Sequence, residues 1–512
     1  MARIICYDGV GLIGGNKILL EDKEAKIWFD FGTNFSTVSM FYEEFLSPKA
    51  CLGLYEPLQM GLLPRLKGLY RADLVTELAD PWEGVEAEDV GDVSGIIISH
   101  AHLDHIGAIH YVTEDIPIYC SAMTAAIARA SQDTGRSVND LCYVIPRETC
   151  ETGGLVSTNH RKVPSNRRPF YLVEEQPSEA FLDFWDTSPG VREIDGPSLG
   201  ESTTCGGMRL RRYPVDHSIY GACAWSVETG AGTVVYTGDI RCHGRNGALT
   251  LRFAEEVSKL QPRVLIIEGT RIASNRGSTE EDVASRAFEE VKKATGLVIA
   301  DFGPRNVERL DTFLRIAKET DRQLLVTIKD AYLLECMGLV DSSVPSLEDE
   351  SIGIYDEFEA RSDTWKKSIK ARFQHKLVEP QNVKTNQGEY ICCFSFLDVN
   401  ELAYLKPIPG SIWIYSSCEP FNEEMVFDMK RLRAWLDHFA VAPLGIADED
   451  ERNPFHVSGH ASRDDLLKVI DIINPSLVIP VHLEERNLPE YVRALEGRRG
   501  YALPEKGVPI EI

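Results

Sequence analysis

Short apolar segments alternate along the chain with longer segments of helical periodicity. Each apolar run ends at a polar residue or a glycine, which is typical of buried strands. Between them, Ser278 with Glu281 three residues on predicts a capping box, and Gly296 predicts the end of that helix. This alternation predicts an α/β protein. The predicted strands are 17–20, 25–31, 94–99, 234–236, 264–267, 297–300, 324–328, 412–415 and 477–481.

Two further segments change this picture. Apolar side chains at helical spacing over 425–439 predict a helix, and we interpret their stripe as a core face rather than a cofactor site. The segment 134–207 is rich in Pro, Gly, Ser, Thr and Arg and has weak periodicity, so we expect a loop-dominated insertion. Its place in the chain, between histidine motifs described below, makes it a candidate substrate-facing flap.

The composition is that of a globular protein. A chain of 512 residues that is 43% hydrophobic exceeds the size of one typical core, so we expect two domains. The first ten residues do not resemble a signal peptide, and no apolar run approaches the roughly 20 residues of a membrane span. The twelve cysteines are scattered and form no C-x-x-C pair. We therefore expect a soluble, cytoplasmic protein with reduced thiols.

The formal charge of −25 constrains the partners, because it repels polyanions at long range. A nucleic acid would have to be held locally, by metal ions and by a few basic clusters. Solvated surface is the simpler interpretation of each cluster. The clusters are Arg161, Lys162, Arg167 and Arg168; Arg209, Arg211 and Arg212; and Lys366, Lys367, Lys370 and Arg372.

The string SHAHLDH follows the predicted strand 94–99 and carries the strongest chemical signal. In an extended chain His100 and His102 point the same way, and the turn that follows lets Asp104 and His105 face a second point nearby. Imidazole nitrogens with a carboxylate suit zinc or a similar divalent ion. The string therefore predicts a metal site.

Three isolated polar residues also follow predicted strands. They are His217 in PVDHSIYG, Asp239 in VVYTGDIR and His482 in VIPVHLEE. Each alone would be interpreted as an ordinary hydrogen-bonded residue. Together with the histidine string they are candidate ligands, because distant parts of a chain must converge to complete a metal site.

The order H-x-H-x-D-H, HSI and TGD resembles the metallo-β-lactamase superfamily. The resemblance implies a four-layered αββα fold with two metals at one edge of a β-sandwich. We expect two Zn²⁺ ions, with Mn²⁺ or Mg²⁺ as alternatives. The implied roles are His100, His102 and His217 at one metal, Asp104, His105 and His482 at the other, Asp239 as the bridge, and Asp30 in WFDFG as the residue that orients a ligand.

The long interval between Asp239 and His482 contains an extra α/β segment. Glu268 in LIIEGTR, His460 in HVSGHAS and His482 in IPVH resemble motifs A, B and C of the β-CASP subgroup of nucleases, and a histidine in motif C is similar to the RNA-processing members. The resemblance implies three segments: 1–270, the first part of the metallo-β-lactamase domain; 271–454, the β-CASP domain; and 455–512, the second part of the first domain.

Within this subgroup, HVSGHAS, FGPRN and SSCEPFNEEM resemble the ribonuclease J family around its nucleotide pocket. Independently, Ser462 and Asp465 predict a helix start just after His460, where free backbone N–H groups favour an anion. Ordinary turn residues are the alternative interpretation of the candidate phosphate-binding residues. These are His456, Ser458, Ser416 and Ser417.

These features predict a metal-dependent ribonuclease that hydrolyses RNA by a two-metal-activated water, as a 5′-to-3′ exonuclease, an endonuclease or both. Asp104 would accept a proton, and His460, oriented by Glu268, would protonate the leaving oxygen or steady the phosphate. The expected partner is single-stranded RNA, without a membrane, and homo-oligomerisation is left open. The alternatives are a DNA nuclease, a small-molecule metallo-hydrolase and an inactive scaffold. We interpret the remaining histidines as structural or surface residues: His110, His160, His243, His375 and His438.

Overall fold

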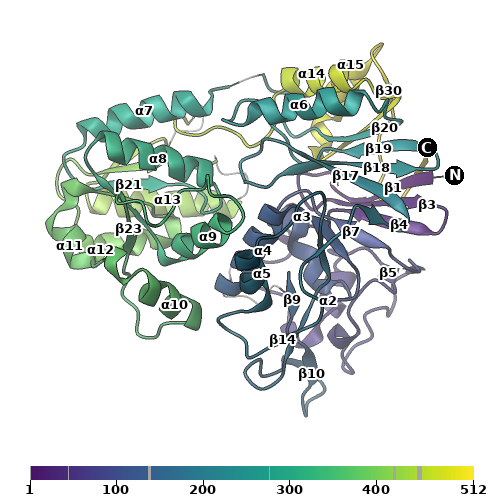
Figure 1. Cartoon of the computed structure of the whole chain (residues 1–512), viewed down its shortest axis with the longest axis horizontal. Helices are drawn as coiled ribbons and strands as arrows, with labels where there is room; N and C mark the ends of the chain where they lie inside the picture. The colour runs from purple at the N-terminus through teal and green to yellow at the C-terminus, as the bar shows by residue number, and fades with distance from the viewer. Residues whose placement is uncertain (1, 44, 136–139, 276, 419–422, 447–452) are drawn as a thin grey trace.

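The structure is a computed structural model that describes residues 2–43, 45–135, 140–275, 277–418, 423–446 and 453–512. Two sheets face each other and helices cover the outer side of each, which gives the αββα sandwich (Figure 1). The helices outside one sheet are α6 (Gly247–Ser258), α14 (Arg463–Ile473) and α15 (Leu488–Leu495). Those outside the other are α3 (Leu103–Ile106), α4 (Ala122–Thr134) and α5 (Glu179–Asp186).

The two sheets of the sandwich have eight and seven strands. The first, in spatial order, is β15 (Gly200–Glu201), β13 (Phe170–Leu172), β8 (Ile118–Cys120), β7 (Gly95–Ile97), β4 (Ala25–Phe29), β3 (Lys17–Asp22), β1 (Ala2–Asp8) and β31 (Pro509–Glu511). The second is β16 (Thr204–Cys205), β17 (Met208–Pro214), β18 (Cys223–Thr229), β19 (Gly232–Tyr236), β20 (Val264–Glu268), β28 (Leu477–Val481) and β30 (Gly500–Tyr501). Alternate apolar residues of both sheets, such as Ile18, Leu20, Trp225 and Val227, fill the space between them.

A third, seven-stranded sheet lies beside the sandwich, on the left in Figure 1. Its strands are all parallel, and both faces carry apolar side chains against helices, which explains their continuous apolar runs. The strands are β24 (Leu377–Val378), β23 (Ile352–Tyr355), β22 (Gln323–Val326), β25 (Tyr390–Cys392), β21 (Val298–Asp301), β26 (Ile412–Tyr415) and β27 (Ala442–Leu444). The carboxyl ends of β21, β22 and β26 face the sandwich and form one wall of the cavity described below.

Helices α7 to α10 cover one face of this sheet and α11 to α13 cover the other. Their bounds are α7 (Glu280–Lys293), α8 (Val307–Glu319), α9 (Ile328–Gly338), α10 (Thr364–Arg372), α11 (Pro380–Thr385), α12 (Leu402–Leu405) and α13 (Glu423–His438). Two short helices, α1 (Phe35–Val38) and α2 (Tyr55–Gln59), belong to the sandwich part of the chain. Small sheets pair β2 (Val10–Gly11) with β29 (Leu483–Glu484), β5 (Leu66–Lys67) with β6 (Glu88–Asp89), β10 (Arg147–Thr149) with β11 (Leu155–Ser157), and β12 (Ser165–Arg167) with β9 (Tyr143–Val144) and β14 (Ile194–Asp195).

The nine predicted strand segments are confirmed with small shifts at their ends, whereas the predicted start of one helix is wrong. Helix α7 is capped by Thr279, whose side chain accepts from the backbone N–H of Asp282, instead of by Ser278 with Glu281. The predicted strand 324–328 extends past the end of the observed strand, because Thr327 caps helix α9 and Ile328 begins it. The helix predicted over 425–439 is confirmed as α13, and Leu432 of its apolar stripe is buried.

The prediction that 134–207 is a loop-dominated insertion is only partly right. Apart from 136–139, which lie outside the described residues, the segment contains short strands, and β13 and β15 extend the first sheet in parallel with β8. Strands of two or three residues are too short to show a period of two in the sequence. Thr134, the first residue of the segment, lines the cavity and none of the described residues 140–207 does, so the substrate-facing flap stays a prediction.

Two further expectations from the sequence were reduced cysteines and no membrane-spanning segment. The twelve cysteines carry thiols and most are buried, as predicted. Among the described helices, none combines the length and the apolarity needed to cross a bilayer.

A buried carboxyl at the end of β21 predicts a pH dependence of stability. Asp301 is 4% exposed and accepts a hydrogen bond from Trp413 Nε1 at 3.1 Å, and burial raises its pKa to about 7. The folded protein therefore keeps a proton that the unfolded chain has lost, so this group costs stability as pH rises from about 4 to 7. Asp301→Asn should remove that cost.

We expect the stability of Asp301→Asn relative to wild type to increase between pH 5 and pH 8 by about 2 to 3 kcal/mol. Urea unfolding followed by circular dichroism at the two pH values measures the change. Asp437→Asn, at an exposed position of α13, is the control and should show no pH-dependent difference. A constant difference between Asp301→Asn and wild type across this range would contradict the assignment.

Candidate metal centre

The seven predicted ligands come together where strands of the two sandwich sheets end. Strands β19, β20 and β28 are parallel neighbours, so their carboxyl ends meet at one edge and bring Asp239, Glu268 and His482 together. The first sheet contributes the string after β7, and the loop from β17 to β18 contributes His217. His482 adopts a left-handed backbone conformation with φ of 53°, which costs free energy for a histidine and turns the chain sharply at the site.

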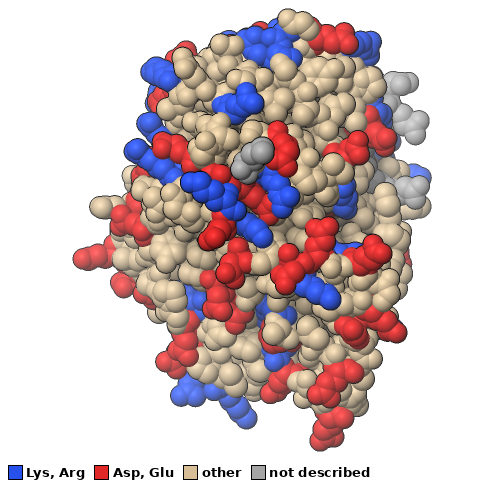
Figure 2. Space-filling view, turned by 90° about the vertical axis from the view of Figure 1, so that its right-hand side faces the viewer, with Lys and Arg blue, Asp and Glu red and all other residues tan. Residues whose placement is uncertain are grey.

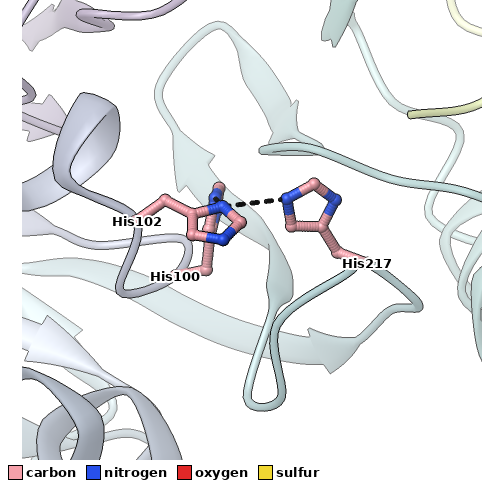
Figure 3. A group of neighbouring side chains, drawn as sticks. All are labelled: His100, His102 and His217. Carbon is pink, nitrogen blue, oxygen red and sulfur yellow. Dashed lines mark hydrogen bonds between the residues drawn. The ribbon is translucent and has the colours of Figure 1, made fainter. Parts of the chain in front are cut away.

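His100, His102 and His217 form the first ligand group (Figure 3). The Nδ1 atom of His102 lies 3.1 Å from the Nε2 atoms of both other rings, so three ring nitrogens converge on one point. Burial lowers the pKa of His100 and His217 well below 6.5 and that of His102 to about 4. The three imidazoles are therefore neutral, which is the form that binds a metal.

Asp104, His105, Asp239 and His482 form the second group. The carboxylate of Asp239 joins the two groups, because its Oδ2 atom lies 3.2 Å from His105 Nε2 and 3.8 Å from the Nε2 atoms of His482, His100 and His217. Burial alone would raise the pKa of Asp239, but the facing imidazoles outweigh it and hold that pKa well below its usual value. An ionised carboxylate between the groups is suited to bridge two cations.

The donor set fits a pair of divalent metal ions. The Oδ1 atom of Asp239 is buried and has no hydrogen-bond partner among the described residues, and such a buried orphan acceptor is costly without a cation. Ring nitrogens that converge without a proton donor between them carry the same cost. Imidazole nitrogens with carboxylate oxygens, and no thiolate among these ligands, suit Zn²⁺ or Mn²⁺.

Hydrogen bonds behind the ligands fix their orientation. Asp30 accepts from His105 Nδ1 at 2.7 Å, from the Tyr236 hydroxyl at 2.6 Å and from Ser99 at 2.7 Å, so it lies where the sequence predicted it, behind a ligand. His217 Nδ1 donates to the carbonyl of Gly459 at 2.6 Å, which leaves Nε2 as the atom that could bind a metal. Such partners fix the tautomer and raise the basicity of a ligand.

Removal of the Asp30 charge tests whether the hydrogen bonds behind the ligands support metal binding. Asp30→Asn should weaken metal binding by about 10- to 100-fold, because a neutral amide accepts a weaker hydrogen bond from His105 than a carboxylate does. Competition with a chromogenic chelator measures the affinity. Asp22→Asn, a buried carboxylate that accepts from Gly230 N, is the control and should bind metal as wild type does. Equal metal affinity of Asp30→Asn and wild type would contradict the role of Asp30 in orienting His105.

Glu268 and His460 form a pair beside the ligands, as the sequence predicted. His460 Nδ1 lies 3.0 Å from Glu268 Oε2 and 3.8 Å from Asp239 Oδ2, while Glu268 Oε1 accepts from Ile240 N at 2.9 Å. Burial lowers the pKa of His460, but the two carboxylates outweigh it and raise the pKa to about 9. His460 is therefore cationic at neutral pH.

A cavity of about 520 Å³ extends from the metal ligands to the carboxyl ends of β21, β22 and β26. The predicted phosphate-binding residues His456, Ser458, Ser416 and Ser417 all line it. The Ser416 side chain is buried and its hydroxyl donates to the carbonyl of Phe455 at 2.5 Å, so this residue holds two cavity loops together. Residues 419–422 of the motif SSCEPFNEEM lie outside the described residues.

Comparison with known proteins agrees with this geometry. Residues 71–284 match the family model described as the metallo-beta-lactamase superfamily, and residues 450–504 match the one described as the Zn-dependent metallo-hydrolase RNA specificity domain. Residues 71–284 are thus similar in sequence to the metallo-β-lactamase superfamily, in agreement with the αββα fold. The first matched segment contains six of the seven candidate ligands, and the second contains His482.

Several relatives that match across most of the chain are named ribonuclease J. The protein from Pyrococcus abyssi is 24% identical over 424 residues, covering 80% of this chain and 78% of that protein. The one from Helicobacter pylori is 20% identical over 518 residues, covering 99% of this chain but 59% of that protein. The chain thus spans about three fifths of the length of the Helicobacter relative. A protein of unknown function from Enterococcus faecalis shares the fold, with a TM-score of 0.65 at 23% identity over the full length of both chains.

Two cavity residues with cationic side chains were not among the predicted site residues. Arg305, half-buried in the loop after β21, donates to the carbonyl of Ala101 at 3.4 Å, and burial lowers its pKa although Asp104 acts against this. Lys329 lines the cavity from the first turn of α9. Arg305 lies in the FGPRN motif noted in the sequence, and both residues follow predicted strands of a parallel sheet, where ligands bind. Thr270, whose Oγ1 lies 2.9 Å from His482 Nδ1, was missed as well.

The basic clusters seen in the sequence do not line the cavity within the described part of the chain. Arg168 is buried and donates to backbone carbonyls, including that of Val112 at 2.9 Å, and Lys366 and Lys370 are paired with acidic residues such as Glu359. Arg168, Lys366 and Lys370 are thus held by contacts within the protein, and local binding of a polyanion by the clusters stays a prediction. On the side of the sandwich that points away from the third sheet, acidic and basic side chains are interspersed (Figure 2).

Proposed function

We propose that the protein is a metal-dependent ribonuclease that hydrolyses RNA phosphodiester bonds. The observation that carries the proposal is the position of Asp239 Oδ2, within 3.8 Å of imidazoles from both ligand groups and of His460. Two ligand groups joined by a carboxylate are suited to phosphodiester chemistry. The match of residues 450–504 to an RNA specificity domain and the similarity to proteins named ribonuclease J favour RNA over other phosphodiesters.

In this proposal His100, His102 and His217 hold one divalent ion and Asp104, His105 and His482 hold the other, with Asp239 between them. A bound pair of such ions activates water for attack on phosphorus and neutralises charge on the phosphate oxygens. The imidazole-rich donors favour Zn²⁺, with Mn²⁺ or Mg²⁺ as alternatives. Asp30 and the carbonyl of Gly459 keep His105 and His217 in the orientation that this requires.

His460 supplies the proton for the leaving oxygen in this scheme. Glu268 fixes its Nδ1 atom, which leaves Nε2 for a substrate, and a pKa near 9 keeps the ring protonated at neutral pH. The same positive charge also steadies the phosphate. Asp104, which is 25% exposed at its side chain and faces His482, accepts the proton that the attacking water loses.

The substrate in this proposal is a single strand of RNA that enters the cavity. Its volume of about 520 Å³ lies in the range of small-ligand pockets, so it holds about a nucleotide beside the metals. Arg305, Lys329 and the loop around Ser458 offer donors to a phosphate at the far end. This arrangement is compatible with 5′-to-3′ exonuclease action, endonuclease action or both. We propose the segments 1–270, 271–454 and 455–512 as the two parts of the metallo-β-lactamase domain and the β-CASP domain between them.

Cleavage of matched substrates tests the proposal. The protein is incubated with 5′-monophosphorylated RNA, 5′-triphosphorylated RNA and DNA of the same sequence, with and without a chelator. We expect cleavage of RNA, much slower cleavage of DNA, loss of activity with the chelator and recovery with Zn²⁺ or Mn²⁺. Faster cleavage of the monophosphorylated RNA from its 5′ end would identify exonuclease action. Equal cleavage of DNA and RNA, or RNA cleavage that survives the chelator, would contradict the proposal.

A further inference from the structure

A buried arginine braces two of the loops that carry metal ligands. Arg241 is fully buried and follows Asp239 by two residues. Its Nε atom donates to Asp216 Oδ2 at 3.2 Å, and its backbone N–H donates to the carbonyl of Asp216 at 2.8 Å. Asp216 directly precedes His217. The two loops therefore cannot move apart without breaking these hydrogen bonds.

The same guanidinium reaches across to the third sheet. Its Nη1 atom donates to Glu280 Oε1 at 3.0 Å and its Nη2 atom donates to Glu308. Glu280 is the first residue of α7 and Glu308 lies in α8, and both helices cover the third sheet (Figure 1). Both carboxylates are almost completely buried, at 3% and 1% exposure. The metal-ligand loops are thus tied to the helices of the neighbouring sheet by charged groups shielded from water.

A second buried arginine continues the connection to the far wall of the cavity. Glu280 Oε2 accepts from Arg309 Nη2 at 2.7 Å. Arg309 Nη1 donates to the carbonyl of Phe455 at 2.7 Å and to the carbonyl of Ser416 at 3.2 Å. Ser416 and His456, the neighbour of Phe455, line the cavity. The contacts therefore run without interruption from the metal-ligand loops through Glu280 to the wall opposite.

We propose that Glu280 and Arg309 are positioning residues that set the spacing between the metal centre and the far wall of the cavity, and so hold an RNA strand in register for cleavage. The proposal rests on the proposed function and deepens it. Neither residue lines the cavity, so both act through others. Burial of paired charges adds little net stability, but it fixes one arrangement of the groups. Displacement by about 1 Å can cost about 100-fold in rate, so such an arrangement matters for catalysis.

Two substrates of different length separate positioning from a purely structural role. Bis(p-nitrophenyl) phosphate is a small diester that needs only the metal end of the cavity. An RNA oligonucleotide contacts both ends. A change in spacing should therefore affect RNA and leave the small diester unaffected, whereas general destabilisation or loss of metal should lower both activities in parallel.

Glu280→Gln and Arg309→Lys are the test variants. We expect KM for RNA to rise about 10-fold or more in each, because the strand no longer meets both ends at once. Metal content and hydrolysis of the small diester should stay within about twofold of wild type. Glu281→Gln is the matched control. Glu281 is the next residue after Glu280, but its carboxylate is 75% exposed and lies 3.9 Å from Arg315. Glu280→Asp, which keeps the charge, should recover part of the RNA affinity.

Loss of one partner of a buried ion pair can prevent folding, so the double variant Glu280→Gln with Arg309→Met is measured beside the single ones by circular dichroism and thermal melting. Folded variants with wild-type KM for RNA would overturn the inference. A parallel loss of both activities, or a double variant that does not fold, would also overturn it in favour of a structural role. If wild-type protein hydrolyses the small diester but not RNA, the proposed function itself fails.

Discussion

Asp239→Asn should lower kcat/KM for RNA by about 10³-fold or more, because in the proposed mechanism a carboxylate between two cations would contribute several kcal/mol to charge stabilisation. The Oδ2 atom of Asp239 lies 3.2 Å from His105 Nε2 and 3.8 Å from the nearest imidazoles of the other group. An amide at this position would bring no negative charge to the two ligand groups, and its N–H₂ group could not bind a cation. Both ions should therefore bind more weakly.

Metal content by mass spectrometry, together with RNA cleavage, measures the effect of Asp239→Asn. The variant should bind fewer than two ions per chain under conditions that saturate wild type. Asp22→Asn, at a buried carboxylate bound to the backbone of Gly230, controls for the loss of a buried charge. Retention of both ions and of activity within about tenfold of wild type would contradict the bridging role, since loss of a bridge should cost far more.

Replacement of His460 should separate catalysis from metal binding. His460→Gln and His460→Ala are each expected to keep the metal content of wild type and to lower kcat by about 10²- to 10⁴-fold, the range of general acid catalysis. Glu268 and Asp239 hold the pKa of His460 at about 9, so the imidazole is protonated below that pH and deprotonated above it. Wild-type kcat should therefore fall on the alkaline side as His460 loses this proton, and the variants should lack this alkaline limb.

His243→Gln is the matched control for His460→Gln. His243 is also a buried histidine near the site, but its Nε2 atom donates to the carbonyl of Ser458 at 2.9 Å and it belongs to neither ligand group. Its replacement should change kcat by less than about tenfold, since it contacts no reacting group. A loss of metal in His460→Gln, or an unchanged rate and pH profile, would show that His460 does not act as the proton donor.

The seven candidate ligands could be named from the sequence because each follows a recognisable apolar run. His482 follows β28 and Asp239 follows β19, and parallel pairing of these strands with β20 brings their ends to one edge. Glu268 at the end of β20 follows from the same rule. The local sequence therefore indicated the residues, and parallel pairing within the second sheet explains why Asp239, Glu268 and His482 meet. The approach of residues 100–105 from the first sheet depends on the packing of the two sheets.

Other features depend on contacts that no local pattern reveals. Arg241 reaches Glu280 and Glu308 only because the third sheet packs against the metal-ligand loops, and nothing near Arg241 in the sequence indicates that. The cap of α7 was misplaced by one residue because Ser278 and Thr279 are both good caps and both are followed three residues later by an acidic residue. Only the folded geometry decides between them.

The central claim is that seven side chains bind two divalent ions next to each other. Anomalous diffraction from crystals of the metal-loaded protein tests it most directly. We expect two peaks about 3.5 to 4 Å apart, one in contact with the imidazoles of His100, His102 and His217 and the other in contact with Asp104, His105 and His482, with Asp239 between them. A single peak, no peak, or peaks away from these residues would contradict the claim.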